Sequence, residues 1–143
     1  MVRSVLSVLA GIAVLTVTSF AIEAAVNPLL IRAFPETLPG PEALLANPWV
    51  RTLTFAYGLM CVTSGGYTTA LIARRRPVTH ATMMGIVQAG LTILAMLSPV
   101  ADHASRVQWI VIATLSIPAA IAGGVVYKGR KSNDGLEQAP TGA

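Results

Sequence analysis

The chain has 143 residues, of which 54% are hydrophobic and only 11% are charged, and its mean hydropathy is +0.67. A soluble domain usually carries about 25% charged residues, so the composition predicts a membrane protein whose first partner is the lipid bilayer. The net charge is +4, but the basic residues stand at the ends of apolar runs, which indicates membrane topology and excludes a nucleic-acid interface. The single cysteine, Cys61, excludes an intrachain disulfide and a cysteine-rich metal site.

The first apolar run extends from Val5 to Val26 and follows Arg3. It approaches the roughly 20 residues that a helix needs to cross a bilayer. Arg3 and the small residues from Ala21 to Ala25 also fit a secretory signal, but the apolar region of a signal is usually about 7–15 residues long. We therefore expect a transmembrane helix. Asn27-Pro28 should end or kink it, because proline lacks an amide donor and disfavours helical backbone in the preceding residue.

An external loop is predicted over residues 27–49. Four prolines and a glycine between Pro35 and Pro48 break regular structure there, with room for one helical turn around Glu42 to Ala46. The apolar segment Leu29 to Phe34 and Trp49 predict that this loop lies along the membrane interface, where tryptophan prefers to be.

Three further spans are predicted at 50–73, 78–100 and 107–127. Only Arg74 to Pro77 separates the second from the third, so these two should be antiparallel neighbours. Arg74, Arg75 and Arg76 are too costly to place in hydrocarbon, so their turn should lie in water, where they are candidates for contact with anionic lipid headgroups. Residues 1–131 are then a single membrane domain, and the polar segment Ser132 to Ala143 is predicted to be a disordered tail.

The orientation follows from the cations near the span ends. One side has Arg3, Arg74, Arg75, Arg76, Lys128, Arg130 and Lys131, and the other has Arg32, Arg51 and Arg106. By the positive-inside bias, both termini should be cytoplasmic. The prediction is an all-α fold, a bundle of four antiparallel transmembrane helices in the bacterial cytoplasmic (inner) membrane.

Small residues four positions apart occur in three of the spans and predict close helix packing. The glycines concerned are Gly65 and Gly66 in the second span, Gly85 in the third and Gly124 in the fourth. A stripe left unused inside the bundle would be free to form a homo-oligomer or to contact another membrane protein. Pro118 should bend the fourth span, because it frees one backbone carbonyl.

Glu23 is the only acid within an apolar run, which makes it a candidate for proton or substrate coupling. At about 1.5 Å per residue it lies about 27 Å from Val5, near the edge of a hydrocarbon core about 30 Å thick. There it would alternatively reach water or pair with Arg32 or Arg51. Gln88 and His80 are the other candidate functional residues, with an interhelical hydrogen bond and an interfacial position as their ordinary roles.

Motifs for catalysis are missing from the sequence. It has no His-Glu-x-x-His, no Gly-x-Ser-x-Gly, no phosphate-binding glycine loop and no pair of carboxylates within the apolar runs. We therefore expect no catalytic residue, no cofactor and no metal site, and a protein that is not an enzyme. A reaction at the membrane interface, using His80 or His103 with Asp102, is the third hypothesis.

The run from Gly65 to Ala81, GGYTTALIARRRPVTHA, is followed by Gly85. It resembles small bacterial integral membrane proteins of four helices with no established activity, in which a glycine-rich second helix ends in an Arg-Pro turn before a histidine. Pro118 and the Gly123-Gly124 pair are similar to the end of their fourth helix. The resemblance implies the fold and no mechanism. The chain departs from the pattern at 106–109, where a tryptophan-tyrosine pair would be expected.

Two functions are consistent with these features. The leading hypothesis is a non-enzymatic accessory or assembly subunit, or a homo-oligomer, that acts through helix packing, because packing motifs are abundant and buried polar groups are few. The alternative is a small proton-coupled transporter that works as a dimer with Glu23 as the coupling acid. Small multidrug exporters are similar in having four helices and a glutamate in the first, although theirs lies near mid-membrane and no proline-rich loop follows it.

Overall fold

The structure, a computed structural model, describes residues 2–73, 75–98 and 106–137, and all regular structure within them is helical. The helices are α1 (Val2–Ala33), α2 (Pro41–Ala46), α3 (Pro48–Ala73), α4 (Pro77–Met96) and α5 (Arg106–Glu137). The all-α prediction is confirmed. Among the described residues, three helical stretches are long and apolar enough to cross a membrane: Ser4–Ala33, Pro77–Met96 and Arg106–Ser132.

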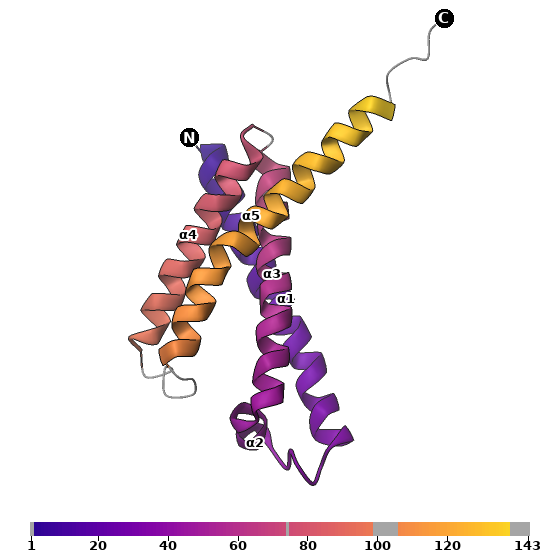
Figure 1. Cartoon of the computed structure of the whole chain (residues 1–143), viewed down its shortest axis with the longest axis vertical. Coiled ribbons are helices and arrows are strands. Elements are labelled where there is room, and N and C mark those ends of the chain that lie inside the picture. The colour runs from indigo at the N-terminus through magenta and orange to yellow at the C-terminus, as the bar shows by residue number, and fades with distance from the viewer. Residues whose placement is uncertain (1, 74, 99–105, 138–143) are drawn as a thin grey trace, which may run out of the picture.

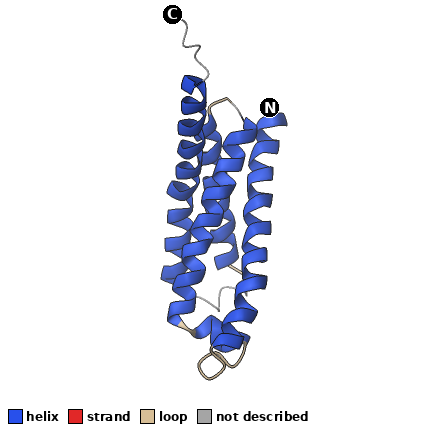
Figure 2. Ribbon diagram, turned by 90° about the vertical axis from the view of Figure 1, so that its right-hand side faces the viewer, coloured by secondary structure: helices blue, strands red, loops and turns tan. Residues whose placement is uncertain are grey.

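The four long helices form an elongated antiparallel bundle (Figures 1 and 2). The short turn that contains Arg75 and Arg76 joins α3 to α4 beside the start of α1, and we call this the arginine end. The opposite end, which we call the α2 end, contains α2. As predicted from the short connection, α3 and α4 are antiparallel and pack against each other.

Helix α3 lies at the centre of the bundle and packs against α1, α4 and α5. Its 26 residues are long enough to span, yet it is not one of the three stretches apolar enough to do so. It is rich in small and hydroxyl-bearing residues, and the hydroxyls donate to carbonyls of their own helix at 2.8–3.0 Å, at Thr63, Ser64, Thr68 and Thr69. Because neighbouring helices cover it and its hydroxyls are satisfied, a central helix has little need of an apolar surface all round.

The lengths of the helices differ in a way that shapes the molecule. Helix α4 has 20 residues, about 30 Å, which matches the thickness of a hydrocarbon core. Helices α1 and α5 have 32 residues each, about 48 Å. Figure 1 shows the excess at opposite ends: α5 projects beyond the bundle at the arginine end, and α1 and α3 project past α4 at the α2 end.

Helix α1 does not end at Pro28 but continues to Ala33. A proline within a helix loses the hydrogen bond that its amide would donate. The added turn is stabilised by packing, because Leu30 and Ile31 contact a buried cluster made by Leu38, Leu44 and Val50. Burial of this apolar face outweighs the missing hydrogen bond, which the sequence pattern alone did not reveal.

The loop beyond α1 folds back over the α2 end. The predicted helical turn is confirmed as α2. Phe34 and Trp49 lie edge to face with their ring centroids 5.9 Å apart, and this contact joins the two ends of the loop. The segment is therefore held by packing on α1 and α3.

Helix α5 passes the predicted span end at Tyr127 and the predicted start of the tail at Ser132, and it ends at Glu137. A polar sequence can continue an existing helix at low cost, since the unfavourable step is nucleation. The rest of the predicted tail, 138–143, lies outside the described residues. So do Arg74 and positions 99–105, which include Asp102 and His103.

Glycines let the helices touch backbone to backbone toward the arginine end. A Cβ atom on Gly66 would collide with the Ala120 backbone, and one on Gly123 would collide with the Thr63 carbonyl oxygen. A Cβ atom on Gly65 would lie 2.7 Å from the Gly11 carbonyl oxygen. Gly85 and Gly124 make similar approaches between α4 and α5. The predicted stripes are thus filled by contacts inside one chain.

Replacing Gly66 with alanine tests this packing. We expect G66A to lower the free energy of unfolding by about 1–3 kcal/mol, because added atoms force a packed backbone apart. The measurement is unfolding by titration with a denaturing detergent. The matched control is G90A, because a Cβ atom on helical Gly90 meets nothing within 4 Å and alanine improves a helix by about 0.5–1 kcal/mol. Equal loss in both variants would contradict the close α3–α5 contact.

Arg76 has left-handed backbone geometry, with φ 49° and ψ 57°, and is the only non-glycine residue with positive φ in the described chain. This conformation lets the chain reverse between Ala73 and Pro77. It costs an L-residue roughly 1–2 kcal/mol.

Glycine at this position should relieve that strain. We expect R76G to raise the free energy of unfolding by up to about 1 kcal/mol, because glycine adopts positive φ freely but loses more backbone entropy on folding. The neighbouring variant R75G removes the same charge without relieving strain and should not stabilise. Thermal unfolding of both variants in one detergent measures the difference. A gain at both positions would point to charge rather than backbone geometry.

Candidate functional site

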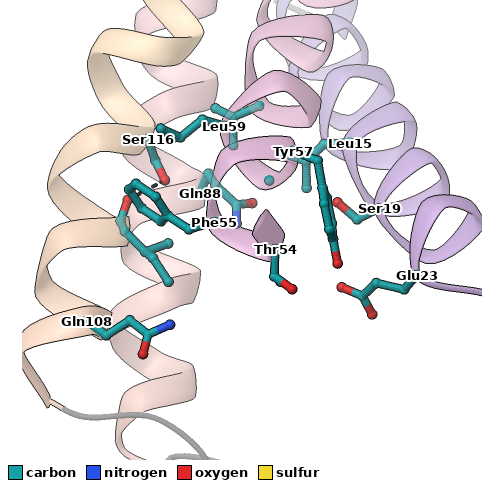
Figure 3. Close-up of a pocket in the computed structure, with 13 residues that line it drawn as sticks. Leu15, Ser19, Glu23, Thr54, Phe55, Tyr57, Leu59, Gln88, Gln108 and Ser116 are labelled. Atoms are coloured by element: carbon teal, nitrogen blue, oxygen red, sulfur yellow. Dashed lines mark hydrogen bonds between the residues drawn. The ribbon is translucent and has the colours of Figure 1, made fainter. Parts of the chain in front are cut away.

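A cavity of about 190 Å³ lies among the four long helices toward the α2 end. Figure 3 shows the side chains that line it. Helix α1 provides Leu15, Ser19 and Glu23; α3 provides Thr54, Phe55, Tyr57, Gly58, Leu59 and Val62; α4 provides Gln88; and α5 provides Gln108, Ile112 and Ser116. Polar and apolar side chains thus meet in one compartment built from a single chain.

The cavity reaches from the middle of the bundle toward the α2 end. Its lining on α1 runs from Leu15 to Glu23, on α3 from Val62 back to Thr54, and on α5 from Ser116 back to Gln108. Each of these stretches covers eight residue steps, which is about 12 Å along a helix. The lining residues on these three helices therefore indicate the same length for the cavity along the bundle.

Local sequence explains why the bundle is open here and closed toward the arginine end. Gly58 lines the cavity, and a Cβ atom built on it meets nothing within 4 Å. By contrast, Gly65 and Gly66, two turns further along α3, face backbone atoms of α1 and α5. Glycine thus leaves space beside α3 in both halves of the helix. Only in the half nearer the arginine end do backbone atoms of neighbouring helices fill that space.

Glu23 is half-buried and its carboxylate points into the cavity from α1 (Figure 3). The Tyr57 hydroxyl points toward it, and the Thr54 side chain lies nearby. Arg32 is exposed, and Arg51 donates from Nη2 to Gln108 Oε1 at 2.7 Å. The described residues thus place Glu23 beside a phenol rather than in an ion pair with either arginine.

Of the other candidates from the sequence, only Gln88 joins Glu23 in the cavity. His80 lies at the arginine end, where its Nδ1 is 3.1 Å from the Arg76 carbonyl oxygen. A carbonyl oxygen only accepts hydrogen bonds, so His80 Nδ1 must carry the hydrogen and donate it. This bond stabilises the first turn of α4. Arg75 and Arg76 are exposed at that end, away from the cavity.

Several lining residues were missed by the sequence analysis, notably Tyr57, Thr54, Ser19 and Gln108. Ser19 and Glu23 are four residues apart, and so are Thr54 and Gly58, so each pair shares a helix face. That spacing was a usable signal. It could not show that the two faces oppose each other, because that depends on how α1 docks on α3.

The bond between Arg51 and Gln108 connects α3 to α5 at the α2 end of the cavity. Gln108 lines the cavity, and both residues also line a neighbouring groove with Phe55. Hydrogen bonds from charged donors are stronger than neutral ones. This bond therefore limits how far α3 and α5 can separate at that end.

The chemistry available in the cavity is that of a single carboxyl group with nearby hydroxyl and amide groups. Within the described part of the chain, no group of three or more His, Cys, Asp or Glu residues is placed to hold a metal ion. One carboxylate can exchange a proton or pair with one positive group. It does not form the pair of carboxylates that most glycoside hydrolases use.

No protein family model matches the chain, and no curated protein or solved structure is significantly similar to it. The site must therefore be interpreted from its own geometry.

Cysteine substitution at two adjacent positions tests whether water enters the cavity. Ser19 lines it, whereas Phe20 is 68% exposed on the outer surface of α1. In a Cys61→Ser background, reconstituted in lipid, we expect a hydrophilic maleimide to label S19C and to leave F20C unlabelled, because only the cavity side should be wetted. The two positions differ in depth by about 1.5 Å, which makes F20C a matched control. Labelling of F20C alone, or of neither, would show that the cavity is not reached by water.

Proposed function

We propose that the protein is a small proton-coupled transporter of the bacterial cytoplasmic membrane, with Glu23 as its coupling acid. The observation that carries the proposal is the placement of this carboxylate in a cavity that extends from the middle of the bundle toward the α2 end and is closed toward the arginine end by backbone contacts. An ionisable group facing the interior of a membrane bundle is a functional candidate by default.

The proposal treats the bundle as four spans, with α3 as the central one. The exposed cations Arg75, Arg76, Lys128, Arg130 and Lys131 lie in the α3–α4 turn or beyond the predicted span end of α5. The positive-inside bias then puts the arginine end and both termini in the cytoplasm. In that orientation the cavity lies toward the exterior, as an outward-facing state of a transporter would require.

Coupling follows from the cost of burying a charge. A carboxylate can be enclosed away from water only when it is neutralised, because an isolated buried ion is strongly unfavourable. Closure of the cavity around Glu23 therefore requires either a bound proton or a bound positive group. A carrier with this property exchanges one for the other across the membrane.

The alternative is an accessory subunit or homo-oligomer that acts through helix contacts. The glycine stripes at Gly65, Gly66, Gly85 and Gly124 do not support it, because they are filled within the chain. The observation that favours it is the outer face of α4, where Gly90 has open space above it and is surrounded by exposed apolar residues, namely Met83, Ile86, Val87, Leu91 and Leu94. Such a face would also serve a transporter that works as a dimer. A dimer contact there would leave the cavity unchanged in composition, because all of its lining comes from one chain.

Substitution of Glu23 with glutamine tests the transport proposal. In vesicles that contain a pH-sensitive dye, we expect the wild type to move protons when members of a panel of small solutes are added outside. E23Q should abolish that signal, because an amide cannot exchange a proton. The control is E42Q in α2, which removes an exposed carboxylate outside the cavity lining. Proton movement that survives in E23Q would reject Glu23 as the coupling acid.

A further inference from the structure

We propose that the cavity selects small organic ammonium ions, with the ammonium group at Glu23 and a short apolar body directed toward the middle of the bundle. This inference rests on the function proposed above, because it names the class of substrate for the same compartment.

The charge of the cavity lining favours a cation. Of the 13 residues that line the cavity, Glu23 is the only acid, and none is lysine, arginine or histidine. Arg51 stands outside this lining and donates to Gln108. An anion would find no positive partner in the lining and would be repelled by Glu23. A monovalent cation neutralises the compartment.

The hydrogen-bonding character of Glu23 also favours an ammonium group. An ionised carboxylate only accepts hydrogen bonds. An ammonium group carries donors and no acceptor, so it complements Glu23. At the inner end of the cavity, Ser116 donates its hydroxyl hydrogen to the Ile112 carbonyl oxygen at 2.7 Å, so this hydroxyl is satisfied within its own helix.

The walls of the cavity also fit a cation with an apolar body. Phe55 and Tyr57 belong to the lining on α3, and aromatic faces attract cations. Away from Glu23, the wall includes Leu15 and Leu59 (Figure 3), and Val62 also belongs to the lining. A ligand with a charged end and a short apolar end therefore fits the direction of the cavity.

The size of the cavity favours a small ligand. The cavity volume of about 190 Å³ is below the roughly 300–1,000 Å³ typical of pockets for drug-sized ligands. A divalent metal ion is disfavoured for a different reason, because calcium and magnesium usually need several oxygen ligands and Glu23 is the only carboxylate here. What remains is an ammonium ion with a few carbon atoms.

An ammonium group in the cavity has two sources, a free amine or the headgroup of a lipid such as phosphatidylethanolamine. Both provide the same chemistry at Glu23. They are separable by experiment, because a sugar-based detergent contains no ammonium group.

Three probes of similar shape test the selectivity: tert-butylammonium, tert-butanol and pivalate. Calorimetric titration of the purified protein in dodecyl maltoside should show tert-butylammonium binding at least tenfold more tightly than tert-butanol, with no binding of pivalate. E23Q should lose the preference for the cation over the alcohol, whereas E23D, which keeps the charge, should retain it. G58L should lose binding of both ligands by filling open space, and E42Q should behave like the wild type. Equal binding of cation and alcohol by the wild type, binding of pivalate, or no binding at all would overturn the inference.

The source of the ammonium group is tested by repeating the cation titration with dihexanoyl phosphatidylethanolamine or dihexanoyl phosphatidylglycerol present. Competition by the first lipid alone identifies a headgroup as a competent occupant, and absence of competition identifies free amines; both results support selection of an ammonium group. Equal competition by both lipids would contradict it.

The two proposals fail in different ways. Cation selectivity that depends on Glu23, together with unchanged proton movement in E23Q vesicles, would reject proton coupling and keep the ammonium site. Loss of proton movement in E23Q, together with no preference for the cation, would keep the coupling acid and reject this substrate class.

Discussion

The structure depends on backbone contact between helices in the half of the bundle nearer the arginine end. Gly66 and Gly123 bring α3 and α5 so close that neither position has room for a single added carbon atom. In a membrane there is little hydrophobic force between helices, so such packing supplies much of the attraction. It also determines where space is left. Because these contacts hold the helices tightly at one end, the larger side chains toward the α2 end keep them apart, and the cavity occupies that region.

This arrangement divides the polar residues into those that bond to their own helix and those that face the cavity. The hydroxyls of Thr63, Ser64, Thr68 and Thr69 lie toward the close-packed half of α3 and donate to their own helix, so they serve the fold. Glu23 and Tyr57 lie toward the open half and face each other in the cavity. The close-packed half of α3 thus carries hydroxyls that bond to their own helix, and the open half faces the carboxylate and the phenol in the cavity.

The sequence predicted the helices better than their ends, and the acid better than its surroundings. Apolar runs and the Arg75–Arg76 turn were sufficient to place the long helices and the antiparallel pairing of α3 with α4. The continuation of α1 through Pro28 was missed, because it depends on the contact of Leu30 and Ile31 with a cluster beyond the helix. Glu23 was recognised from its apolar context alone. The other residues of the cavity lining were not, since Tyr57, Gln108 and Ser116 come from helices whose rotation is set by packing between distant segments.

The geometry of α1 shows how a closed half and an open half can work together. Gly11 touches Gly65 and Thr69 of α3, whereas Glu23, twelve residues further on, lies about 18 Å away along the helix. A tilt of α1 by about 10° around the Gly11 contact would shift Glu23 by about 3 Å, which is the difference between a hydrogen bond and an open gap. Beyond Glu23, however, Leu30 and Ile31 of α1 contact the buried cluster at the α2 end. A tilt of this size would therefore have to repack that cluster, and in the transport proposed above the cost of enclosing a charge would decide when it can occur.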